Sequence, residues 1–482
     1  MQRFLRIFRP LANPHFRSAP RRWSRARRTT AGRALRLLVV LLLPTILSAC
    51  ASPQGQPLHL TWWNVFDDPT VYQDMIKTYE EDHNVDIELV TFSYAEYEQE
   101  LVRSLAAGTG PDIFTIQNTW LPEHRDLIAP VPVAEDFTSA TPDELKAIQP
   151  RVEALPGLRS FVDTYVPTVS QDFVSEGRIY AIPLYVDSLA LYYNKDLLNS
   201  ANQQVPTTWD EFVKVANALT TRDANGRITR SGAALGAATN INRSTDILSA
   251  LMLQNGASPV DTERQFAAFD RGEERADGSE LNPGLDALKF YTDFAIDSSD
   301  HFTWSLDPAI WYSIDNFASG EVAMMLNYSH QVDEVRSKNA KLNFGIARLP
   351  NPAGARFYQT YANYWGQTVS KASPNVLDAW EFINYLSRDD NNLTYLQNAH
   401  KPPAKLAQIP AFENDLDLGV FADQAAVAKS LYTPDINLTE TVLAAAIEDV
   451  ILNRRPALDA LQVAASQITQ RLQSRAFPPT GI

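Results

Sequence analysis

Strands and helices alternate through residues 58–116, and this order constrains the fold more than any other feature of the chain. Three short apolar runs have the pattern of strands: residues 58–63, 85–92 and 112–116. Two amphipathic segments lie between them: residues 69–79 and residues 94–107. Strands that alternate with helices predict an α/β layer with a mostly parallel sheet. Ligands of such sheets bind beyond the carboxyl ends of the strands, here the loops at residues 64–69 and 117–122.

The rest of the chain continues this mixed pattern without an internal repeat. Residues 206–211 are expected to start a helix, because Thr208 and Glu211 fit a capping box. Residues 223–227 contain an Asn-Gly turn, and their spacing does not fit a calcium loop. The remaining expected elements are a helix end and buried strand in residues 317–327 and helices at residues 377–387 and 443–472.

The first 50 residues have the pattern of a bacterial lipoprotein signal. Residues 1–36 contain eleven arginines and no Asp, Glu or Lys, and an apolar run follows at residues 37–47. That run is too short to span a membrane, which takes about 20 residues. The last residue of this run begins the motif Leu-Ser-Ala-Cys at residues 47–50. This motif predicts cleavage before Cys50 and lipidation of the Cys50 thiol. The basic region is unusually long for such a signal. Either translation starts downstream of Met1, or the arginines have a separate role.

Composition excludes several classes of site and partner. Cys50 is the single cysteine, so neither an internal disulfide nor a cysteine metal site can form. The seven histidines are scattered, and no hydrolase, metalloprotease or P-loop motif is present. We therefore expect no catalytic residues, no metal and no cofactor. An alternative from another class is a lipoprotein glycosidase that uses two carboxylates.

The strongly negative net charge of the mature protein argues against nucleic acids and membrane lipids as direct partners. Loss of the signal segment leaves 31 basic and 57 acidic residues, a net charge of −26. Such a protein binds nucleic acid poorly and is repelled by anionic lipid, so a lipid anchor has to hold it at the membrane. About 430 mature residues can build two sizeable cores.

Motifs spread over most of residues 58–475 resemble the family 1 extracellular solute-binding proteins of ABC importers, which include maltose-binding protein. The segments that carry the resemblance are Trp62-Trp63-Asn64, residues 105–113 (LAAGTGPDI), residues 192–198 (YYNKDLL), residues 206–212 (PTTWDEF), residues 320–325 (GEVAMM), and residues 370–373 (SKAS) with residues 379–382 (AWEF). Their order and spacing over so long a span are specific, although each motif alone is short.

The resemblance implies an α/β fold of the two-lobe, type II periplasmic-binding-protein kind, with a hinge between discontinuous lobes. The segments it implies are a signal peptide at 1–49, a lipidated tether at 50–57, lobe 1 at 58–184 and 363–431, lobe 2 at 185–362, and C-terminal helices at 432–482 mainly on lobe 2. The chain would cross between the lobes near residues 184–189, 361–366 and 432–438.

The implied function is the substrate-binding lipoprotein of an ABC importer. It would bind a mono- or oligosaccharide between the lobes, deliver it to the membrane permease subunits, and act as a monomer outside the cytoplasm. Non-sugar solutes, namely a polyamine, a peptide, a phosphate ester or a metal chelate, remain alternatives. A sensor lipoprotein without a transport role is another.

Sugar chemistry selects the candidate ligand-binding residues. Hydroxyls pair with carboxylates and amides, and the C–H faces of a sugar stack on aromatic rings. The candidates are Trp62, Trp63, Asn64, Gln117, Asn118, Trp120, Asp187, Asn327, Tyr328, Tyr364 and Trp365.

Several candidates have an alternative structural role. One of Trp62 and Trp63 must point into the core, because neighbouring strand residues alternate. Asp187 could instead be a hinge carboxylate bonded to backbone amides, and Trp120 and Trp365 could pack on loops. Trp209 and Trp380 lie in helix motifs and are expected in the core.

Overall fold

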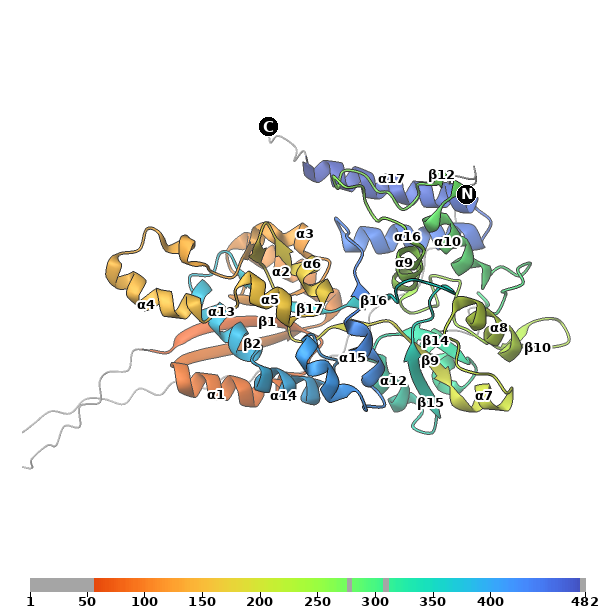
Figure 1. The fold of residues 1–482 in the computed structure, drawn as a ribbon, viewed down its shortest axis with the longest axis horizontal. Coiled ribbons are helices and arrows are strands. Elements are labelled where there is room, and N and C mark those ends of the chain that lie inside the picture. The colour runs from red at the N-terminus through yellow and green to blue at the C-terminus, as the bar shows by residue number, and fades with distance from the viewer. Residues whose placement is uncertain (1–55, 275–279, 307–311, 477–482) are drawn as a thin grey trace, which may run out of the picture. The chain divides into compact units, whose positions relative to one another are not determined.

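The computed structural model describes residues 56–274, 280–306 and 312–476 (Figure 1). The predicted signal segment, Cys50 and Trp311 lie outside these described residues. All elements below belong to the unit formed by Gly55–Ile482. None of the helices in the described part of the chain combines the length and apolar character that a membrane span requires.

Lobe 1 is built on a mixed sheet with the strand order β2-β1-β3-β17-β4, and β7 also pairs with β17. Its strands are β1 (Leu58–Val65), β2 (Val85–Phe92), β3 (Ile113–Gln117), β4 (Ile128–Ala129), β7 (Ile182–Pro183) and β17 (Trp365–Ser370). β1 runs parallel to β2 and β3, as the sequence predicts. β17 comes from far along the chain and pairs antiparallel with β3, β4 and β7.

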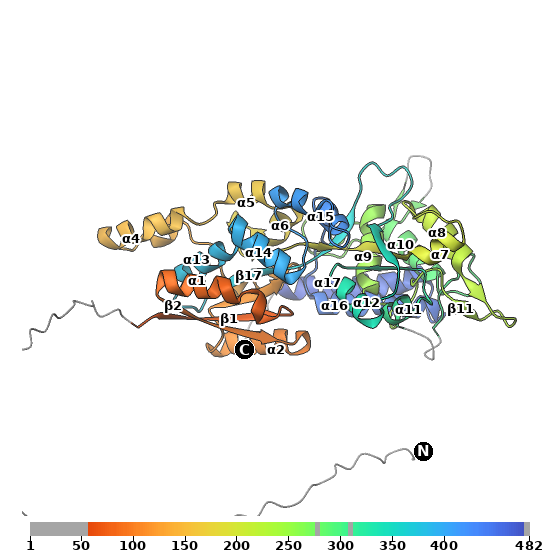
Figure 2. The same ribbon diagram turned by 90° about the horizontal axis from the view of Figure 1, so that it is seen from below.

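Helices surround this sheet and bury a core that includes Leu60, Phe114 and Trp380. They are α1 (Gln73–His83), α2 (Tyr94–Ala107), α3 (Leu121–His124), α4 (Pro142–Glu153), α5 (Leu158–Thr164), α6 (Pro167–Phe173), α13 (Val376–Leu386) and α14 (Asp389–Ala399), with a small pair of strands, β5 (Val174–Ser175) and β6 (Arg178–Ile179). α4 lies at the edge of the lobe in both views and buries none of its residues (Figures 1 and 2).

Lobe 2 has a smaller antiparallel sheet in which β9 (Ala190–Asn194) lies between β14 (Met324–Asn327) and β15 (Phe344–Arg348). Its core includes Leu191, Phe212, Met324, Ile447 and Leu461. The helices are α7 (Lys195–Ser200), α8 (Trp209–Leu219), α9 (Ser244–Asn255), α10 (Pro283–Asp293), α11 (Ser313–Ser319), α12 (Gln331–Lys338), α16 (Ile436–Ile451) and α17 (Ala457–Ala476), and two hairpins are β10 (Thr221–Arg222) with β11 (Ile228–Arg230) and β12 (Glu273–Glu274) with β13 (Glu280–Leu281).

Three short strands join the lobes in one small sheet, β18-β16-β8. They are β8 (Asp187–Ser188), β16 (Thr360–Asn363) and β18 (Ala428–Lys429), and β16 lies between the two large sheets in Figure 1. Each of these segments passes from one hydrophobic core to the other. Val186, Ala362 and Ala428 pack in the core of lobe 1. Leu189, Tyr361 and Leu431, which lie close to them in sequence, pack in the core of lobe 2. α15 (Gly419–Ala425) contributes side chains to both cores. The predicted lobe boundaries at single residues stay predictions.

Local chemistry explains why several elements begin and end where they do. Thr208 Oγ1 accepts a hydrogen bond from the Glu211 amide at 3.3 Å, and the Glu211 carboxylate accepts one from the Thr208 amide. This confirms the predicted capping box at the start of α8. The Asn-Gly turn is also confirmed, because Gly226 has a φ of 81° between β10 and β11.

The predicted helical region at residues 443–472 consists of two helices, α16 and α17, that pack on each other. Asn453 between them has a φ of 52°, and Pro456 lacks the amide hydrogen that a continuous helix needs. A break at this point lets α17 fold back along α16.

Candidate ligand-binding cleft

A cavity of about 420 Å³ lies between the two lobes, and we call it the aromatic cleft. Lobe 1 contributes the loop after β1, the start of α2, the end of β3 and the start of β17. Lobe 2 contributes the residue before α9 and the start of α12. The lining residues are Phe66, Asp67, Asp68, Val71, Tyr94, Gln117, Tyr185, Asp187, Arg243, His330, Asp333, Asn363, Trp365, Asn398, Ala399, His400 and Lys401. The carboxyl ends of β1, β2 and β3 therefore meet at the cleft, as expected for a parallel sheet.

Two exposed aromatic rings cover the lobe 1 wall of the cleft. Phe66 and Tyr94 are stacked with centroids 5.6 Å apart, and their exposed fractions are 56% and 44%. Both pack edge-on against the buried Trp365, which itself rests on Trp120 with ring centroids 5.0 Å apart. Phe66 has a φ of 70°, a conformation that a bulky residue adopts only under strain. The backbone thus turns an apolar ring toward the cavity.

The charged groups near Phe66 are bonded to one another. Asp67 accepts hydrogen bonds from the hydroxyls of Tyr72 at 2.6 Å and Tyr395 at 2.9 Å, and it forms an ion pair with Lys401. The Lys401 ammonium also lies 4.0 Å from the ring centroid of Tyr185. Buried and paired charges of this kind fix the shape of the wall.

Asp187 lines the cleft and belongs to β8, in the first segment that crosses between the lobes. Its carboxylate accepts hydrogen bonds from the amides of Ser188 at 2.8 Å and Ser329 at 3.0 Å and from the Ser329 hydroxyl at 2.8 Å. His330 Nδ1 lies 3.5 Å from the same carboxylate. These contacts match the alternative role of a hinge carboxylate bonded to backbone amides. Contact between Asp187 and a ligand stays a prediction.

Arg243 differs from the other charged residues of the cleft. Among them, its side chain alone has no hydrogen bond or ion pair to a described residue, and its Nε is buried without a partner. Its guanidinium lies over the ring of Tyr328, 5.6 Å from the centroid. The Oε1 atom of Gln117 is also buried without a partner. The Arg243 guanidinium and the Gln117 Oε1 atom are therefore recognition groups of the cleft that the described part of the protein does not itself bond.

Two carboxyl groups set the electrostatics behind Arg243. Asp246 accepts hydrogen bonds from the Tyr328 hydroxyl at 2.8 Å and from Asn363 Nδ2 at 3.5 Å. The pKa of Glu440 is raised to about 7, because the raising effects of burial and of nearby Asp246 outweigh the lowering effect of Arg243. Burial lowers the pKa of Arg243, but Asp246, Tyr328 and Glu440 outweigh this and keep the group charged.

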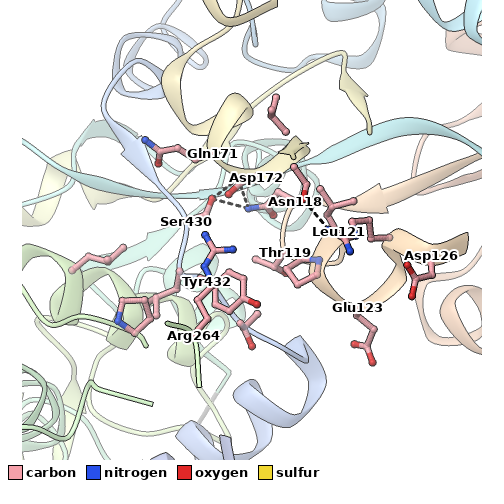
Figure 3. Close-up of a pocket in the computed structure, with 18 residues that line it drawn as sticks. Asn118, Thr119, Leu121, Glu123, Asp126, Gln171, Asp172, Arg264, Ser430 and Tyr432 are labelled. Carbon is pink, nitrogen blue, oxygen red and sulfur yellow. Dashed lines mark hydrogen bonds between the residues drawn. The ribbon is translucent and has the colours of Figure 1, made fainter. Parts of the chain in front are cut away.

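A second cavity, of about 520 Å³, lies beside the crossover segments, and we call it the hinge cavity (Figure 3). Its lining residues are Asn118, Thr119, Leu121, Pro122, Glu123, Arg125, Asp126, Gln171, Asp172, Val174 and Ser175 of lobe 1, Leu253, Pro259 and Arg264 of lobe 2, and residues 430–433. Among the described residues that line it, Tyr432 is the single aromatic one, and the Arg264 guanidinium lies over that ring, 4.4 Å from its centroid. One face of the Tyr432 ring is therefore already occupied within the protein.

Asp172 is the centre of the polar contacts at the hinge cavity. It accepts hydrogen bonds from Ser430 at 2.7 Å and Asn118 at 3.2 Å (Figure 3). Tyr364 at 2.6 Å and Thr168 at 3.4 Å donate to the same carboxyl group. Burial raises its pKa to about 6, against the lowering effect of these hydrogen bonds. Since Tyr364 and Ser430 belong to two crossover segments, the Asp172 carboxyl ties the hinge to lobe 1.

The structure divides the eleven predicted site residues into several groups. Gln117, Asp187 and Trp365 line the aromatic cleft, and Asn118 lines the hinge cavity. The others do not line either cavity: Trp62, Trp63, Asn64, Trp120, Asn327, Tyr328 and Tyr364.

The two neighbouring tryptophans of β1 alternate as strand residues must. Trp62 is fully buried, donates to Gln367 at 3.0 Å and packs edge-on against Tyr72. Trp63 faces the other way and packs on Phe92. Neither residue lines the aromatic cleft. Contact between either tryptophan and a ligand stays a prediction.

Several cleft residues escaped the sequence analysis. Phe66, Asp67 and Asp68 lie in the loop after β1 that the sequence predicts as part of the site, although Phe66 is not among the predicted ligand contacts. Tyr94 follows β2, whose carboxyl end is not among the predicted ligand-binding loops. Arg243, His330, Asp333 and Lys401 come from lobe 2 and the later part of lobe 1, where no sequence pattern marks them.

One group of described residues has metal-like spacing. The ligand atoms of Glu98, Glu123 and His124 lie within 4.8 Å of one another. These residues already bond within the protein: Glu98 to His124 and Asn437, and Glu123 to Arg471. These bonds tie α2 and α3 to the C-terminal helices.

Comparison with known proteins agrees with this architecture. The profile of the bacterial extracellular solute-binding protein family matches residues 64–393. The galactooligosaccharide-binding protein of Bacillus subtilis is 20% identical over 433 residues, which cover 89% of this chain and 93% of that protein.

Solved structures share the fold. The cyclic α-maltosyl-1,6-maltose binding protein from Arthrobacter globiformis has a TM-score of 0.68 and 19% identity, with 87% of this chain and 100% of that chain covered. The sugar-binding protein MalE from Xanthomonas citri has a TM-score of 0.68 and 20% identity, with 88% and 100% covered. The two-lobe fold expected from the sequence motifs is confirmed. The chain belongs to the bacterial extracellular solute-binding protein family.

Proposed function

We propose that this protein binds a carbohydrate in the aromatic cleft and delivers it to the permease of an ABC importer. The observation that carries the proposal is the pair of exposed rings, Phe66 and Tyr94, which lie beside unpartnered polar groups on Gln117 and Arg243. A sugar needs both kinds of surface, since its C–H face stacks on a ring while its hydroxyls exchange hydrogen bonds.

Relatives support this substrate class. Two Bacillus subtilis relatives carry the names galactooligosaccharide-binding protein and maltodextrin-binding protein. Proteins of the same fold are described with maltotetraose and with mannobiose bound. A cavity of about 420 Å³ has room for at least one sugar ring, which suits a mono- or oligosaccharide.

The rest of the proposal concerns location and partners. The mature protein begins at Cys50, is held to the membrane by lipid on that thiol, and works outside the cytoplasm as a monomer without catalytic activity. Mass spectrometry of the membrane fraction tests the anchor. Lipid on an N-terminal Cys50 supports it, and a mature form that retains residues 1–49 contradicts it.

A binding screen tests the substrate class. The fragment Ala51–Ile482 is titrated by calorimetry with neutral di- to tetrasaccharides of glucose, galactose, mannose and arabinose. A ligand at about 100 times its Kd should add about 2.7 kcal/mol to the free energy of unfolding. If no sugar binds or raises the melting temperature, the carbohydrate proposal fails.

A polyamine is the second candidate, because four carboxylates line the cleft: Asp67, Asp68, Asp187 and Asp333. Three of them already have cationic or histidine partners, namely Lys401, His330 and His400. Arg243 would also repel a cation. Spermidine in the same screen separates the two candidates.

Ligand binding should close the lobes as near-rigid bodies, with backbone rotation confined to the crossover segments at β8, β16 and residues 428–438. A ligand favours the closed form only through contacts that both walls make with it. Small-angle scattering of the same fragment measures this. A radius of gyration that stays constant at saturating ligand argues for a rigid site.

A further inference from the structure

Arg243 occupies a costly position that the fold itself does not explain. It precedes α9 with a φ of 62°, its side chain makes no hydrogen bond to that helix, and its Nε is buried without a partner. Left-handed backbone strain and an unused buried donor both destabilise the folded protein. A residue kept there at this cost is typical of a ligand contact.

The charges around Arg243 indicate which ligand group it would meet. Four carboxylates and two permanent cations, Arg243 and Lys401, line the cleft, so its net charge is −2 with neutral histidines. Asp246 and Glu440 lie close enough to Arg243 to raise its pKa. The positive charge of the Arg243 guanidinium is therefore already balanced by nearby carboxyl groups that do not bond to it. An anionic ligand would be repelled by these carboxyl groups.

We propose that Arg243 is the main polar anchor of the ligand and that it donates two hydrogen bonds to hydroxyl oxygens of a neutral sugar. The proposal rests on the carbohydrate function proposed above and names the residue that orients the sugar. The planar guanidinium presents several donors in a fixed geometry, which suits two neighbouring oxygens. Asp246 and Glu440 hold the charge of Arg243 without occupying its donors.

The rings of Phe66 and Tyr94 belong to lobe 1, whereas Arg243 belongs to lobe 2. A sugar that stacks on the rings and bonds to Arg243 contacts both walls at once. Arg243 thereby links recognition of the ligand to closure of the lobes.

Calorimetry on three variants tests the anchor. Asn tolerates the left-handed backbone, so Arg243→Asn removes the guanidinium with little added strain. Arg243→Lys keeps the charge but loses the paired donors. Arg264→Asn is the matched control, since Arg264 also has a positive φ, 55°, and lines the hinge cavity.

We expect Arg243→Asn to raise the Kd of the best neutral oligosaccharide from the screen about 10- to 100-fold, as for loss of hydrogen bonds from a charged donor. Arg243→Lys should recover only part of this loss, and Arg264→Asn should change the Kd less than about threefold. Equal Kd values for wild type and Arg243→Asn would overturn the anchor while leaving the carbohydrate function intact.

A double-mutant cycle that combines Arg243→Asn with Glu440→Gln distinguishes two roles of Arg243: contact with the sugar, and neutralisation of the Glu440 charge. If Arg243 contacts the sugar, Arg243→Asn weakens binding by a similar factor in the Glu440→Gln background. If the loss disappears in that background, Arg243 acts only by neutralising Glu440 and the anchor is wrong.

The charge of the ligand is tested with uronic-acid oligosaccharides and spermidine. Wild type should bind the neutral sugar at least about tenfold more tightly than its uronate counterpart. Tighter binding of the uronate overturns the neutral-ligand inference alone. If no sugar binds and Arg243→Asn tightens binding of spermidine, both this inference and the carbohydrate function fail.

Discussion

The aromatic cleft and the hinge cavity lie between the same two lobes and have similar volumes, but their side chains are used differently. In the hinge cavity, the Asp172 carboxyl accepts hydrogen bonds from four residues of the protein. In the aromatic cleft, Phe66 and Tyr94 expose their rings and Arg243 has no bonded partner. Volume alone therefore does not identify a binding site, whereas unused recognition groups do.

The contrast assigns different roles to the two cavities. Groups that the protein satisfies internally contribute to stability, because their removal leaves buried partners unpaired. Groups that the protein leaves unsatisfied contribute to binding, because a ligand supplies the missing partner. Substitutions in the hinge cavity should therefore affect stability, and substitutions in the cleft should affect affinity.

The largest effect is expected from Asp172→Ala. Its removal leaves the buried Tyr364 hydroxyl without its acceptor and takes one of their partners from Ser430 and Asn118, so the free energy of unfolding should fall by about 3 kcal/mol. Urea denaturation measures this, and Ser430→Ala should cost only about 1 kcal/mol as the matched smaller change. A large loss of affinity with unchanged stability would reverse the roles of the two cavities.

Replacement of both exposed rings, Phe66→Ala with Tyr94→Ala, should weaken sugar binding by about 2 kcal/mol or more. Stability should change little, because both rings are about half exposed. Calorimetry gives the affinity, and Tyr312→Ala serves as the control because Tyr312 is an exposed aromatic residue that lines neither cavity. Unchanged affinity in the double variant would show that the ligand binds elsewhere.

Stability should also depend on pH through two buried carboxyl groups. The pKa values of Asp172 and Glu440 are raised to about 6 and about 7, so the folded protein keeps protons that the unfolded chain has lost. The contribution of both groups to stability is therefore present near pH 4 and is lost as the pH rises to 7. Relative to wild type, Glu440→Gln should gain about 1–2 kcal/mol between pH 5 and pH 8. Urea denaturation across this range checks it, and a constant difference would show that Glu440 is not perturbed.

The smallest effect is expected from Arg471→Ala, outside both cavities. Arg471 of α17 contacts Glu123 of lobe 1 at 2.7 Å and Asp435 at 3.1 Å, and it is partly exposed. Such pairs contribute up to about 1 kcal/mol, and salt weakens them. Thermal unfolding at low and high salt measures the loss. A change in affinity larger than the change in stability would indicate that this contact controls lobe closure.

Local elements could be predicted well because their causes lie within a few residues. The bounds of β2 and α2 follow from strand alternation and from Gly108, which ends the helix in a left-handed conformation. Apolar periodicity alone does not place the break at residues 452–456, where Asn453 has a left-handed conformation and Pro456 lacks an amide hydrogen. Trp209 and Trp380 lie in the cores, as their helix motifs predicted.

The cleft was harder to predict, because exposure is decided by residues distant in sequence. Trp62 and Phe66 are both aromatic residues near the end of β1, yet Trp62 is buried against Tyr72 and Phe382 while Phe66 is exposed. The difference depends on the Phe66 backbone conformation and on Trp365, which arrives about 300 residues later. No local pattern distinguishes the two rings.

The sequence by itself determined the class of fold, the family and the loops from which lobe 1 could contact a ligand, because these follow from local periodicity and from motifs in a fixed order. Only the tertiary structure decided which side chains face the cleft and which are satisfied within the protein. Hydrogen bonding and burial depend on contacts between distant segments, so Asp172 and Arg243 acquire their opposite roles only when the lobes are assembled.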